Sequence, residues 1–518
     1  MTDETPRYYV TTPIYYVNDV PHIGHAYTTL ACDVLARFHR LDGREVLFLT
    51  GTDEHGQKVE KAAAAAGVDP QGFCDRVSGR FRELLDVMDF SADDFIRTTE
   101  PRHIAAAQEL WRRMEANGHI YEGVYAGWYS VRDEAFYQES ELVEGPKGER
   151  LAPTGAPVEW VEEPSFFFRL SAFQERLLAF YDAHPDFVLP KSRMNEVRSF
   201  VAGGLKDLSI SRTSFSWGIP VPGHPGHIMY VWVDALTNYL SALGFPDEHA
   251  PRFRRFWPAD LHMVGKDILR FHAVYWPAFL MAADITPPRR VFAHGWWTNE
   301  GQKISKSLGN VIDPFQLVAE FGVDAVRYFL LRAVPFGQDG DFARRAFVER
   351  VNADLANDFG NLAQRVLSMI FKNCGTRIPD PGILEEDDRA LLDSISAARE
   401  EMRAALAVQA FHEAIEALWG RVSEANGYVA RMQPWALKKT DPERMATVLW
   451  TAAEAVRRLA ILAQPFTPQA MARLLDQMGV PAERRRFADL TDPAARIAPG
   501  TGIDRPQGVF PRLAWEEA

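Results

Sequence analysis

The first 53 residues carry the pattern that most constrains the fold. "YYVTT" at residues 8–12 is rich in strand-forming residues, and "EVLFLTGTD" at residues 45–53 reads as a continuous buried strand. Between them, apolar residues recur at helical spacing from Leu30 to Leu41, and Gly43 follows as a C-terminal stop. A strand, a helix and a strand in about 45 residues predict two parallel neighbouring strands joined by a right-handed crossover.

Two polar segments stand where this unit predicts a ligand. "PHIGH" at residues 21–25 follows the first strand, and "GTDEHG" at residues 51–56 closes the second. Ligands of parallel sheets collect beyond the carboxyl ends of the strands. We therefore expect both segments to belong to one binding site.

The remaining chain divides by composition. At 518 residues, several domains are expected. Residues 116–225 are rich in aromatics and Gly-Pro punctuation, which predicts a β-containing insertion; the α/β pattern resumes with "IMYVWVDAL". "GWWTNEGQKISKSLGNVID" reads as a loop leading into helices, and beyond about residue 346 the chain reads as helical. We expect an α/β fold with a Rossmann-type parallel sheet in two halves, 1–115 and 226–292, split by the insertion 116–225, then a linking domain 293–345 and an all-α bundle 346–518.

Bulk properties exclude several classes of protein. A net charge of −13 argues against non-specific coating of nucleic acid, although local basic pairs such as Arg344-Arg345 can still meet a shaped one. No apolar run is long enough for a bilayer, and the N-terminus lacks a secretory pattern, so a cytoplasmic protein without a membrane association is expected. Three scattered cysteines without a CxxC pair argue against a disulfide framework and a cysteine-based zinc site.

His22 and His25 flank Gly24 at the start of the first helix. Two histidines at this spacing can hold a metal, cap the helix or bind an anion, and HxxH alone does not decide between them. Gly24 lets a base or a phosphate approach the backbone, and a helix N-terminus adds oriented N–H groups. The combination favours a triphosphate site with histidine donors.

"KISKS", residues 303–307, places Lys303 and Lys306 in a loop between two glycines. Lysine-rich loops are usually solvated surface. When ATP is attacked at its α-phosphate, however, negative charge builds on the departing pyrophosphate. Two mobile ammonium groups that reach this charge chiefly in the transition state would accelerate the reaction.

The ordered pair "HIGH" and "KISKS" on this architecture resembles the signature of class I aminoacyl-tRNA synthetases, with Ile304 in place of the usual methionine. The insertion is too short for the editing domain of the isoleucine, valine and leucine enzymes, and the zinc set of the cysteine enzyme is not visible. The resemblance to the methionyl-tRNA synthetase family runs nearly end to end. It is carried by "TTPIYYVNDVPHIGH", "YVWVDALTNY", "GKDILRFHAVYWPA", "EEPSFFFRLS", "DLSISRTSFSWGIPVP", "NDFGNLAQR" and "GVFPRL".

This resemblance implies a reaction and its residues. The enzyme would make methionyl-adenylate from methionine and ATP with Mg²⁺, then charge a tRNA bearing the methionine anticodon through the helical domain. The residues implied for ATP are His22, Gly24, His25, Gly265, Asp267, Lys303 and Lys306. Those implied for methionine are Asp53, which would hold the ammonium, with Ile14, Tyr16, Trp232, Ala235, Tyr239, Ile268, His272 and Trp276. Those implied for the anticodon are Asn361, Arg365 and Trp435.

Some of these residues also have a purely structural explanation. Trp276 taken alone is better explained by core packing, whereas for Trp435 helix packing is the less favoured alternative to reading the anticodon. Asp53 resists such a reading better, because a carboxylate at a buried strand end needs a partner, which a substrate ammonium supplies.

Two features depart from many members of the family. The insertion has "YAGWYSVRDEAFYQESEL" where zinc-binding cysteine knuckles often stand, so we expect it to fold without metal and expect no protein-bound zinc. The sequence also ends just after the helical domain, without an appended dimer-forming module, and a monomer is expected.

Two other functions remain as alternatives. A nucleotidylyltransferase of the HIGH superfamily needs no long helical domain with anticodon-like residues. A catalytically inactive tRNA-binding protein has no reason to keep His22, His25, Lys303 and Lys306 together.

Overall fold

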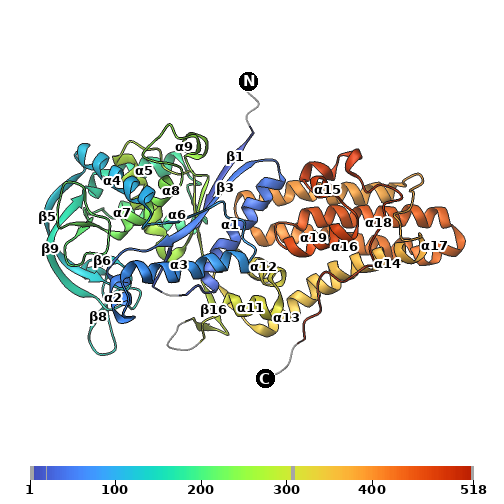
Figure 1. Ribbon diagram of the computed structural model, residues 1–518, viewed down its shortest axis with the longest axis horizontal. Coiled ribbons are helices and arrows are strands. Elements are labelled where there is room, and N and C mark those ends of the chain that lie inside the picture. The colour runs from blue at the N-terminus through green and yellow to red at the C-terminus, as the bar shows by residue number, and fades with distance from the viewer. Residues whose placement is uncertain (1–4, 19, 305–309, 515–518) are drawn as a thin grey trace.

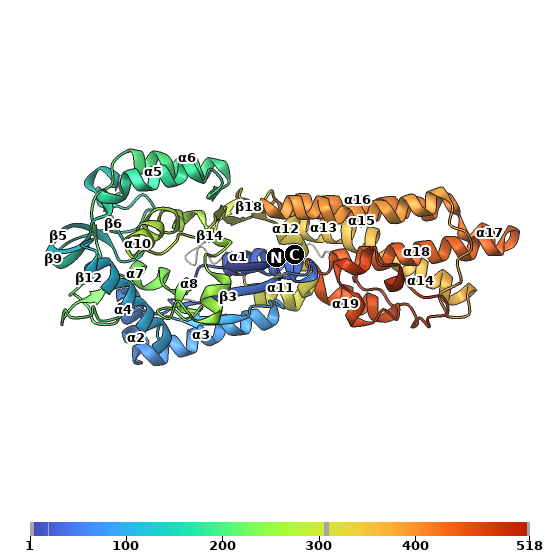
Figure 2. The same ribbon diagram turned by 90° about the horizontal axis from the view of Figure 1, so that it is seen from above.

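The structure is a computed structural model that describes residues 5–18, 20–304 and 310–514. The molecule is elongated, with an α/β half at one end and an all-α half at the other (Figure 1). In the view from above, the two halves meet around α1 and α12 (Figure 2).

A parallel sheet organises the α/β half. Among the described residues it has seven strands in the order β10-β15-β14-β1-β3-β2, with β4 also paired to β3. The strands are β1 (Arg7–Thr11), β2 (Tyr15–Tyr16), β3 (Glu45–Asp53), β4 (Asp94–Arg97), β10 (Val188–Leu189), β14 (Leu261–Gly265) and β15 (Val291–His294).

The N-terminal unit folds as the sequence predicts. β1 and β3 are parallel neighbours, with Val10 in register with Phe48, and α1 (Ile23–Leu41) joins them. Gly43 follows the helix with φ +84°, a left-handed conformation that glycine adopts without a steric penalty.

Alternating side chains of β1 and β3 pack against helices on opposite faces of the sheet. Tyr8, Val10 and Phe48 belong to the core that contains α1, whereas Tyr9 and Leu47 belong to the core on the other face. A parallel sheet buried on both faces is the doubly wound arrangement, which leaves the carboxyl ends of the strands open to a ligand. The helices of the α/β half include α2 (Gln57–Ala65), α3 (Pro70–Val87), α4 (Pro101–Ala116), α7 (Val231–Leu236), α8 (Asn238–Ser241), α9 (Pro251–Phe256) and α10 (Trp276–Ala282).

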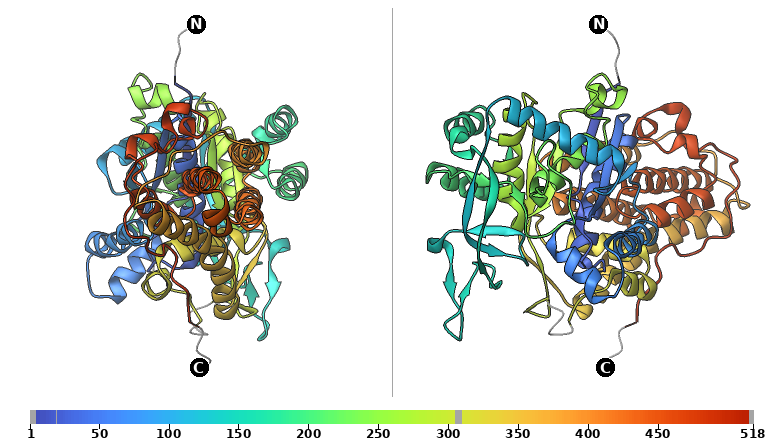
Figure 3. Two further views of the ribbon diagram at one scale, coloured as in Figure 1. Left: turned by 90° about the vertical axis from the view of Figure 1, so that its right-hand side faces the viewer. Right: turned by 60° about the vertical axis from the view of Figure 1, so that its left-hand side comes forward.

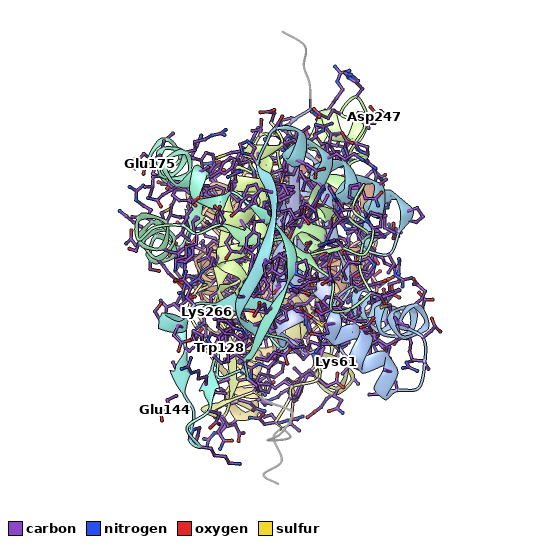
Figure 4. All side chains as sticks on the ribbon, turned by 90° about the vertical axis from the view of Figure 1, so that its left-hand side faces the viewer. Lys61, Trp128, Glu144, Glu175, Asp247 and Lys266 are labelled. Atoms are coloured by element: carbon purple, nitrogen blue, oxygen red, sulfur yellow. The ribbon has the colours of Figure 1, made fainter. Side chains whose placement is uncertain are left out.

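The insertion is built on a long antiparallel ribbon. β5 (Ile120–Ser130) pairs with β9 (Glu159–Phe168), flanked by β6 (Ala135–Tyr137) and β11 (Leu208–Ser209). Seen from that end, Trp128 lies on this ribbon, and Glu144 lies on the projecting hairpin of β7 (Val143–Glu144) and β8 (Arg150–Leu151) (Figure 4).

The same stretch also holds structure that its alternating pattern does not predict. Two helices, α5 (Gln174–Ala183) and α6 (Lys191–Ala202), form a separate layer beside the sheet (Figure 3). Strand β10 lies between them in sequence and pairs with β15, so residues 116–225 contribute a strand to the large sheet. Two further short strands, β12 (Ser211–Arg212) and β13 (Ile228–Met229), form an antiparallel pair.

The predicted loop at residues 295–313 is partly a sheet, which corrects the expectation. β16 (Trp297–Asn299) pairs antiparallel with β17 (Gln302–Lys303) and parallel with β18 (Gly340–Phe342). Strands of two or three residues leave no periodicity in the sequence, which is why the pattern read as a loop. Helices α11 (Pro314–Phe321), α12 (Val323–Arg332) and α13 (Arg344–Val351) follow.

The C-terminal half is helical, as its periodicity predicts. Leu355, Phe359, Leu362 and Val366 are all buried in the core that also contains α1, so one hydrophobic core runs from the sheet into the bundle. No helix in the described ranges is long and apolar enough to cross a membrane. The elements are a π-helix (Asn352–Gly360), α14 (Asn361–Asn373), α15 (Glu386–Ala407), α16 (Phe411–Met432), α17 (Pro434–Thr440), α18 (Pro442–Ala463) and α19 (Pro468–Gln477).

Candidate active site

A cavity of about 610 Å³ opens at the carboxyl ends of the parallel strands. Its size is that of a site for a small organic ligand. The structure brings most of the sequence-predicted ATP and methionine residues into its wall. These are Ile14, Tyr16, His22, Gly24, His25, Asp53, Trp232, Ala235, Tyr239, Gly265, Asp267, Ile268 and His272.

The two histidines of "HIGH" cap the helix that they begin. Nδ1 of His22 accepts a hydrogen bond from the backbone N–H of Gly24 at 3.0 Å, and Nδ1 of His25 accepts from the backbone N–H of His22 at 3.1 Å. A neutral imidazole that accepts at Nδ1 carries its proton on Nε2. Capping therefore fixes the tautomer in which each ring offers an Nε2–H donor, and the capping and anion-binding interpretations are compatible.

His25 is uncharged. Burial and, secondarily, the neighbouring His22 hold its pKa well below the ordinary value. Tyr15 packs edge-on against the ring with a centroid separation of 4.8 Å, and its hydroxyl donates to the carbonyl of His25. His25 can thus supply a fixed neutral donor to a phosphate.

Asp53 ends strand β3 with an unpartnered oxygen. Its Oδ1 is buried and has no hydrogen-bond partner among the described residues. Burial raises the pKa of Asp53 well above its ordinary value, and the nearby Asp234 and Glu134 raise it further. A cation bound beside this carboxylate would favour its charged form and so lower the pKa again.

Behind Asp53, Asp234 is held as an anion by two histidines. Nδ1 of His55 lies 2.7 Å from one carboxylate oxygen, and Nε2 of His103 lies 2.7 Å from the other. Burial alone would raise the pKa of Asp234, but the charge of His55 and the hydrogen bonds from both rings outweigh it and lower the pKa. The charge of Asp234 acts on Asp53 and contributes to its raised pKa.

Aromatic side chains form the apolar wall of the cavity. Trp232 stacks on Phe271 with ring centroids 3.8 Å apart and planes 7° apart. Nδ1 of His272 lies 2.9 Å from the carbonyl of Ile268 and must donate to it, so Nε2 accepts from the hydroxyl of Tyr239 at 2.7 Å. Burial lowers the pKa of His272 to about 4, which keeps this wall uncharged.

Trp276 does not reach the cavity wall. Its side chain is fully buried behind Tyr239, with ring centroids 6.0 Å apart. In this structure it packs in the core.

Gly265, the last residue of β14, and Asp267 also line the cavity. A Cβ on Gly265 would stand 2.5 Å from Oδ1 of Asp267, so the glycine lets this carboxylate fold back over the strand end. The indole N–H of Trp296 donates to the same Oδ1 at 3.1 Å. Asp267 is exposed.

The structure describes only part of the "KISKS" segment. Lys303 closes strand β17 opposite Thr298, and strand β16 starts beside Trp296 at the cavity rim. Lys306 and its two serine neighbours lie outside the described residues, and so does the side chain of Lys303.

The anticodon candidates lie on the surface of the helical domain. Trp435 is 50% exposed on α17 at the far tip (Figures 1 and 2), so it is not a buried packing residue. Asn361 and Arg365 are exposed on α14, and Nη2 of Arg365 donates to Oδ1 of Asn426 at 3.1 Å.

The cavity also contains residues that the sequence interpretation missed. Glu134, from the insertion, accepts the hydroxyl of Tyr16 at 2.8 Å, and His294, at the end of β15, contacts Thr28 of α1 at 2.7 Å. The sequence signal for His294 is its position at the end of a buried strand, whereas Glu134 has no such signal. The described residues contain no group of three or more His, Cys, Asp or Glu side chains arranged to hold a metal ion.

Comparisons with known proteins agree with this geometry. Residues 8–367 match the family model described as tRNA synthetases class I (M), and residues 378–518 match the anticodon binding domain of methionyl tRNA ligase. Methionine–tRNA ligases of Mesorhizobium japonicum and Brucella suis are 58% and 57% identical to the chain, each over 98% of both sequences.

Solved structures give the same result. Mycobacterium tuberculosis methionyl-tRNA synthetase in complex with methionyl-adenylate is 54% identical, superposes with a TM-score of 0.95, and is matched over 98% of this chain and 100% of its own. Its apo form superposes with a TM-score of 0.89 at 50% identity, over 100% of both chains. The chain therefore belongs to the methionine–tRNA ligase family of class I tRNA synthetases.

Proposed function

We propose that the cavity joins methionine to AMP and then releases the methionyl group to tRNA(Met), with the residues in the roles that follow. The observation that carries the proposal is the buried, unpartnered Oδ1 of Asp53 in the same cavity as two histidines that offer Nε2–H donors. The carboxylate of Asp53 suits a cation, and the two N–H donors suit an anion. Methionine and ATP bring both.

Methionine binds with its ammonium at Asp53 and the backbone of Ile14. Its side chain lies against Tyr16, Trp232, Ala235, Tyr239, Ile268 and His272, with Trp276 behind Tyr239. This wall is apolar, with a polarisable aromatic surface, and a thioether gains about 0.3–1.5 kcal/mol from each sulfur–aromatic contact. The neutral state of His272 supports this role, because a charged ring would have to be desolvated beside the sulfur.

ATP binds across the start of α1. His22 and His25 donate to its phosphates, Gly24 allows close approach, and Gly265 with Asp267 contacts the ribose. Mg²⁺ arrives with the nucleotide and is held chiefly by phosphate oxygens, as is common for this ion.

The first step is a displacement at phosphorus. A methionine carboxylate oxygen attacks the α-phosphate, a new P–O bond forms, and the bond to pyrophosphate breaks. Negative charge grows on the leaving pyrophosphate, where Lys303 and Lys306 stabilise it together with the histidine donors. No protein nucleophile is needed, so the enzyme acts by positioning and electrostatic stabilisation.

In the second step a ribose hydroxyl at the 3′ end of the tRNA attacks the methionyl carbonyl, and AMP leaves. Asn361, Arg365 and Trp435 read the anticodon, because exposed aromatic and hydrogen-bonding side chains suit unstacked single-stranded bases. In this scheme residues 1–115 and 226–292 form the catalytic domain, 116–225 the insertion, 293–345 the linking domain and 346–518 the anticodon domain. In this scheme a monomer carries out both steps.

Exchange of labelled pyrophosphate into ATP tests the proposal. With each standard amino acid in turn, exchange should require methionine. A nucleotidylyltransferase would exchange with another substrate class, and an inactive tRNA-binding protein would show no exchange at all. Either result would overturn the proposal.

A further inference from the structure

Glu134 comes from the insertion yet lies in the wall of the catalytic cavity, beside Tyr16. Its Oε1 accepts the hydroxyl proton of Tyr16 at 2.8 Å, and its other oxygen accepts the hydroxyl proton of Tyr129. The hydroxyl of Tyr230 donates to the backbone carbonyl of the same residue at 2.9 Å. Three phenols from distant parts of the chain therefore converge on Glu134.

The backbone of Glu134 shows how strongly this position is determined. Its φ is +48°, in the left-handed region that residues with a Cβ seldom occupy. Such a conformation persists only where the surroundings hold it. The residue is 6% exposed, so nearly all of that support comes from protein contacts.

The catalytic domain is shaped to receive this contact. A Cβ on Gly56, which has φ +111°, would stand 2.5 Å from the hydroxyl of Tyr16 and 3.1 Å from Oε1 of Glu134. The backbone N–H of Lys58 also points to Oε1, at 3.4 Å. The segment after β3 thus makes room for the Tyr16–Glu134 pair and adds a donor to it.

Tyr16 stands in the part of the cavity that matters for methionine. On strand β2 it is in register with Asp53 on the adjacent strand β3. Neighbouring residues in register project to the same side of a sheet, so the phenol and the carboxylate share one side of the pocket. A group that fixes the phenol fixes the wall next to the carboxylate.

We propose that Glu134 is a positioning residue: it anchors the phenol of Tyr16 against the methionine pocket and thereby lets the insertion set the affinity for methionine. This inference rests on the proposed function, which places Tyr16 in the methionine pocket. Glu134 acts through Tyr16 and takes no part in the transfer of the phosphoryl group. Burial raises the pKa of Glu134, while the hydrogen bonds from Tyr129 and Tyr16 oppose that rise, as expected of a carboxylate that accepts both protons.

A double-mutant cycle on methionine-dependent pyrophosphate exchange tests the inference. Glu134→Ala should raise the KM for methionine about tenfold, the effect of losing one hydrogen bond of this kind, and leave kcat and the KM for ATP within about twofold. Tyr16→Phe should raise the same KM by a similar factor. Because the two residues act through one contact, the double variant should be no worse than the single variants.

Further variants separate a positioning role of Glu134 from a role in folding. Glu134→Gln keeps an acceptor oxygen for Tyr16 and should recover most of the affinity. Glu139→Ala is the matched control: this carboxylate lies in the same insertion and accepts the indole N–H of Trp128 at 2.6 Å, but it does not line the cavity. Its KM for methionine should not change. If Glu134→Ala does not fold, Tyr129→Phe, which removes the second phenol, should raise the KM for methionine about threefold.

Several results would overturn the inference. The first is an unchanged KM for methionine in Glu134→Ala, or in Tyr129→Phe if that variant has to replace it. The second is a double variant whose KM rises by the product of the two single effects. The third is an equal loss of kcat and of affinity for both substrates. Asp53→Asn distinguishes the two levels of the account. If that variant also keeps a normal KM for methionine, the methionine site itself is misassigned. If only Glu134→Ala keeps it, the positioning role alone is wrong.

Discussion

Arg327 and Asp33 form an ion pair in which both side chains are fully buried, with Nη2 of Arg327 2.6 Å from Oδ2 of Asp33. The pair joins α12 to α1, the helix whose first turn His22 and His25 cap. The other guanidinium N–H groups donate to backbone carbonyls of Met88, Asp89, Pro465 and Phe466. One side chain therefore ties the α/β half to the turn between α18 and α19 of the helical half.

Breaking this pair should destabilise the whole protein. Arg327→Met leaves Asp33 buried without its main partner and should lower the free energy of unfolding by about 3–5 kcal/mol. Chemical denaturation of the intact chain measures this. Arg345→Met, which removes an exposed partner of Glu349, is the control and should change stability little. Equal stabilities of the two variants would show that the buried pair is not a clamp.

The two functions assigned to His22 can be separated by substitution. Asparagine is a good N-cap but has no Nε2–H, so His22→Asn should keep the stability of α1 and lower the adenylation rate about a hundredfold. His22→Ala should lose the rate and, in addition, about 1 kcal/mol of stability. Pre-steady-state adenylation and thermal unfolding give the two readouts. A normal rate in His22→Asn would exclude the histidine from the phosphate site.

Lys306 should act on the transition state rather than on binding. Lys306→Ala should depress the rate of adenylation by about 10²–10³ and leave the affinity for methionine nearly unchanged, because charge on pyrophosphate develops only as the bond breaks. Single-turnover kinetics with varied methionine separates rate from affinity. An unchanged rate would remove the role of this lysine.

Trp435 should affect only the tRNA step. Trp435→Ala should weaken binding of tRNA(Met) by about 1–3 kcal/mol, the value of one stacked base, and leave pyrophosphate exchange intact. Trp435→Phe retains a stacking surface and should recover part of the loss. If charging and exchange fell equally in Trp435→Ala, the residue would be structural.

The sequence predicts the parts of this molecule that depend on periodicity and local motifs. The β1-α1-β3 unit, the β-containing insertion and the helical half follow from apolar spacing, and Asp53 follows from its place at the end of a buried strand. Helical spacing alone does not decide whether Trp435 packs in the core or lies on the surface, where the structure places it.

The remaining features depend on contacts between segments far apart in the chain. Glu134 precedes a three-residue strand, and no local pattern shows that it will meet Tyr16, 118 positions away in the sequence. The sequence does not predict the β16–β17 hairpin, because strands of two or three residues are too short to show alternating polar and apolar side chains. Arg327 reads as an ordinary charged residue of a helix, and only the tertiary structure buries it.

The binding of methionine to wild-type enzyme and to Asp53→Asn across pH, measured by calorimetry, tests the central claim most directly. In the empty pocket the pKa of Asp53 lies well above its ordinary value of about 4, so below that raised pKa the carboxyl group is protonated. A bound ammonium favours the carboxylate, so binding releases a proton, and wild-type affinity should rise with pH until the raised pKa is passed. Asp53→Asn should bind about a hundredfold more weakly, without this rise. Wild-type affinity and an unaltered pH profile in Asp53→Asn would contradict the account.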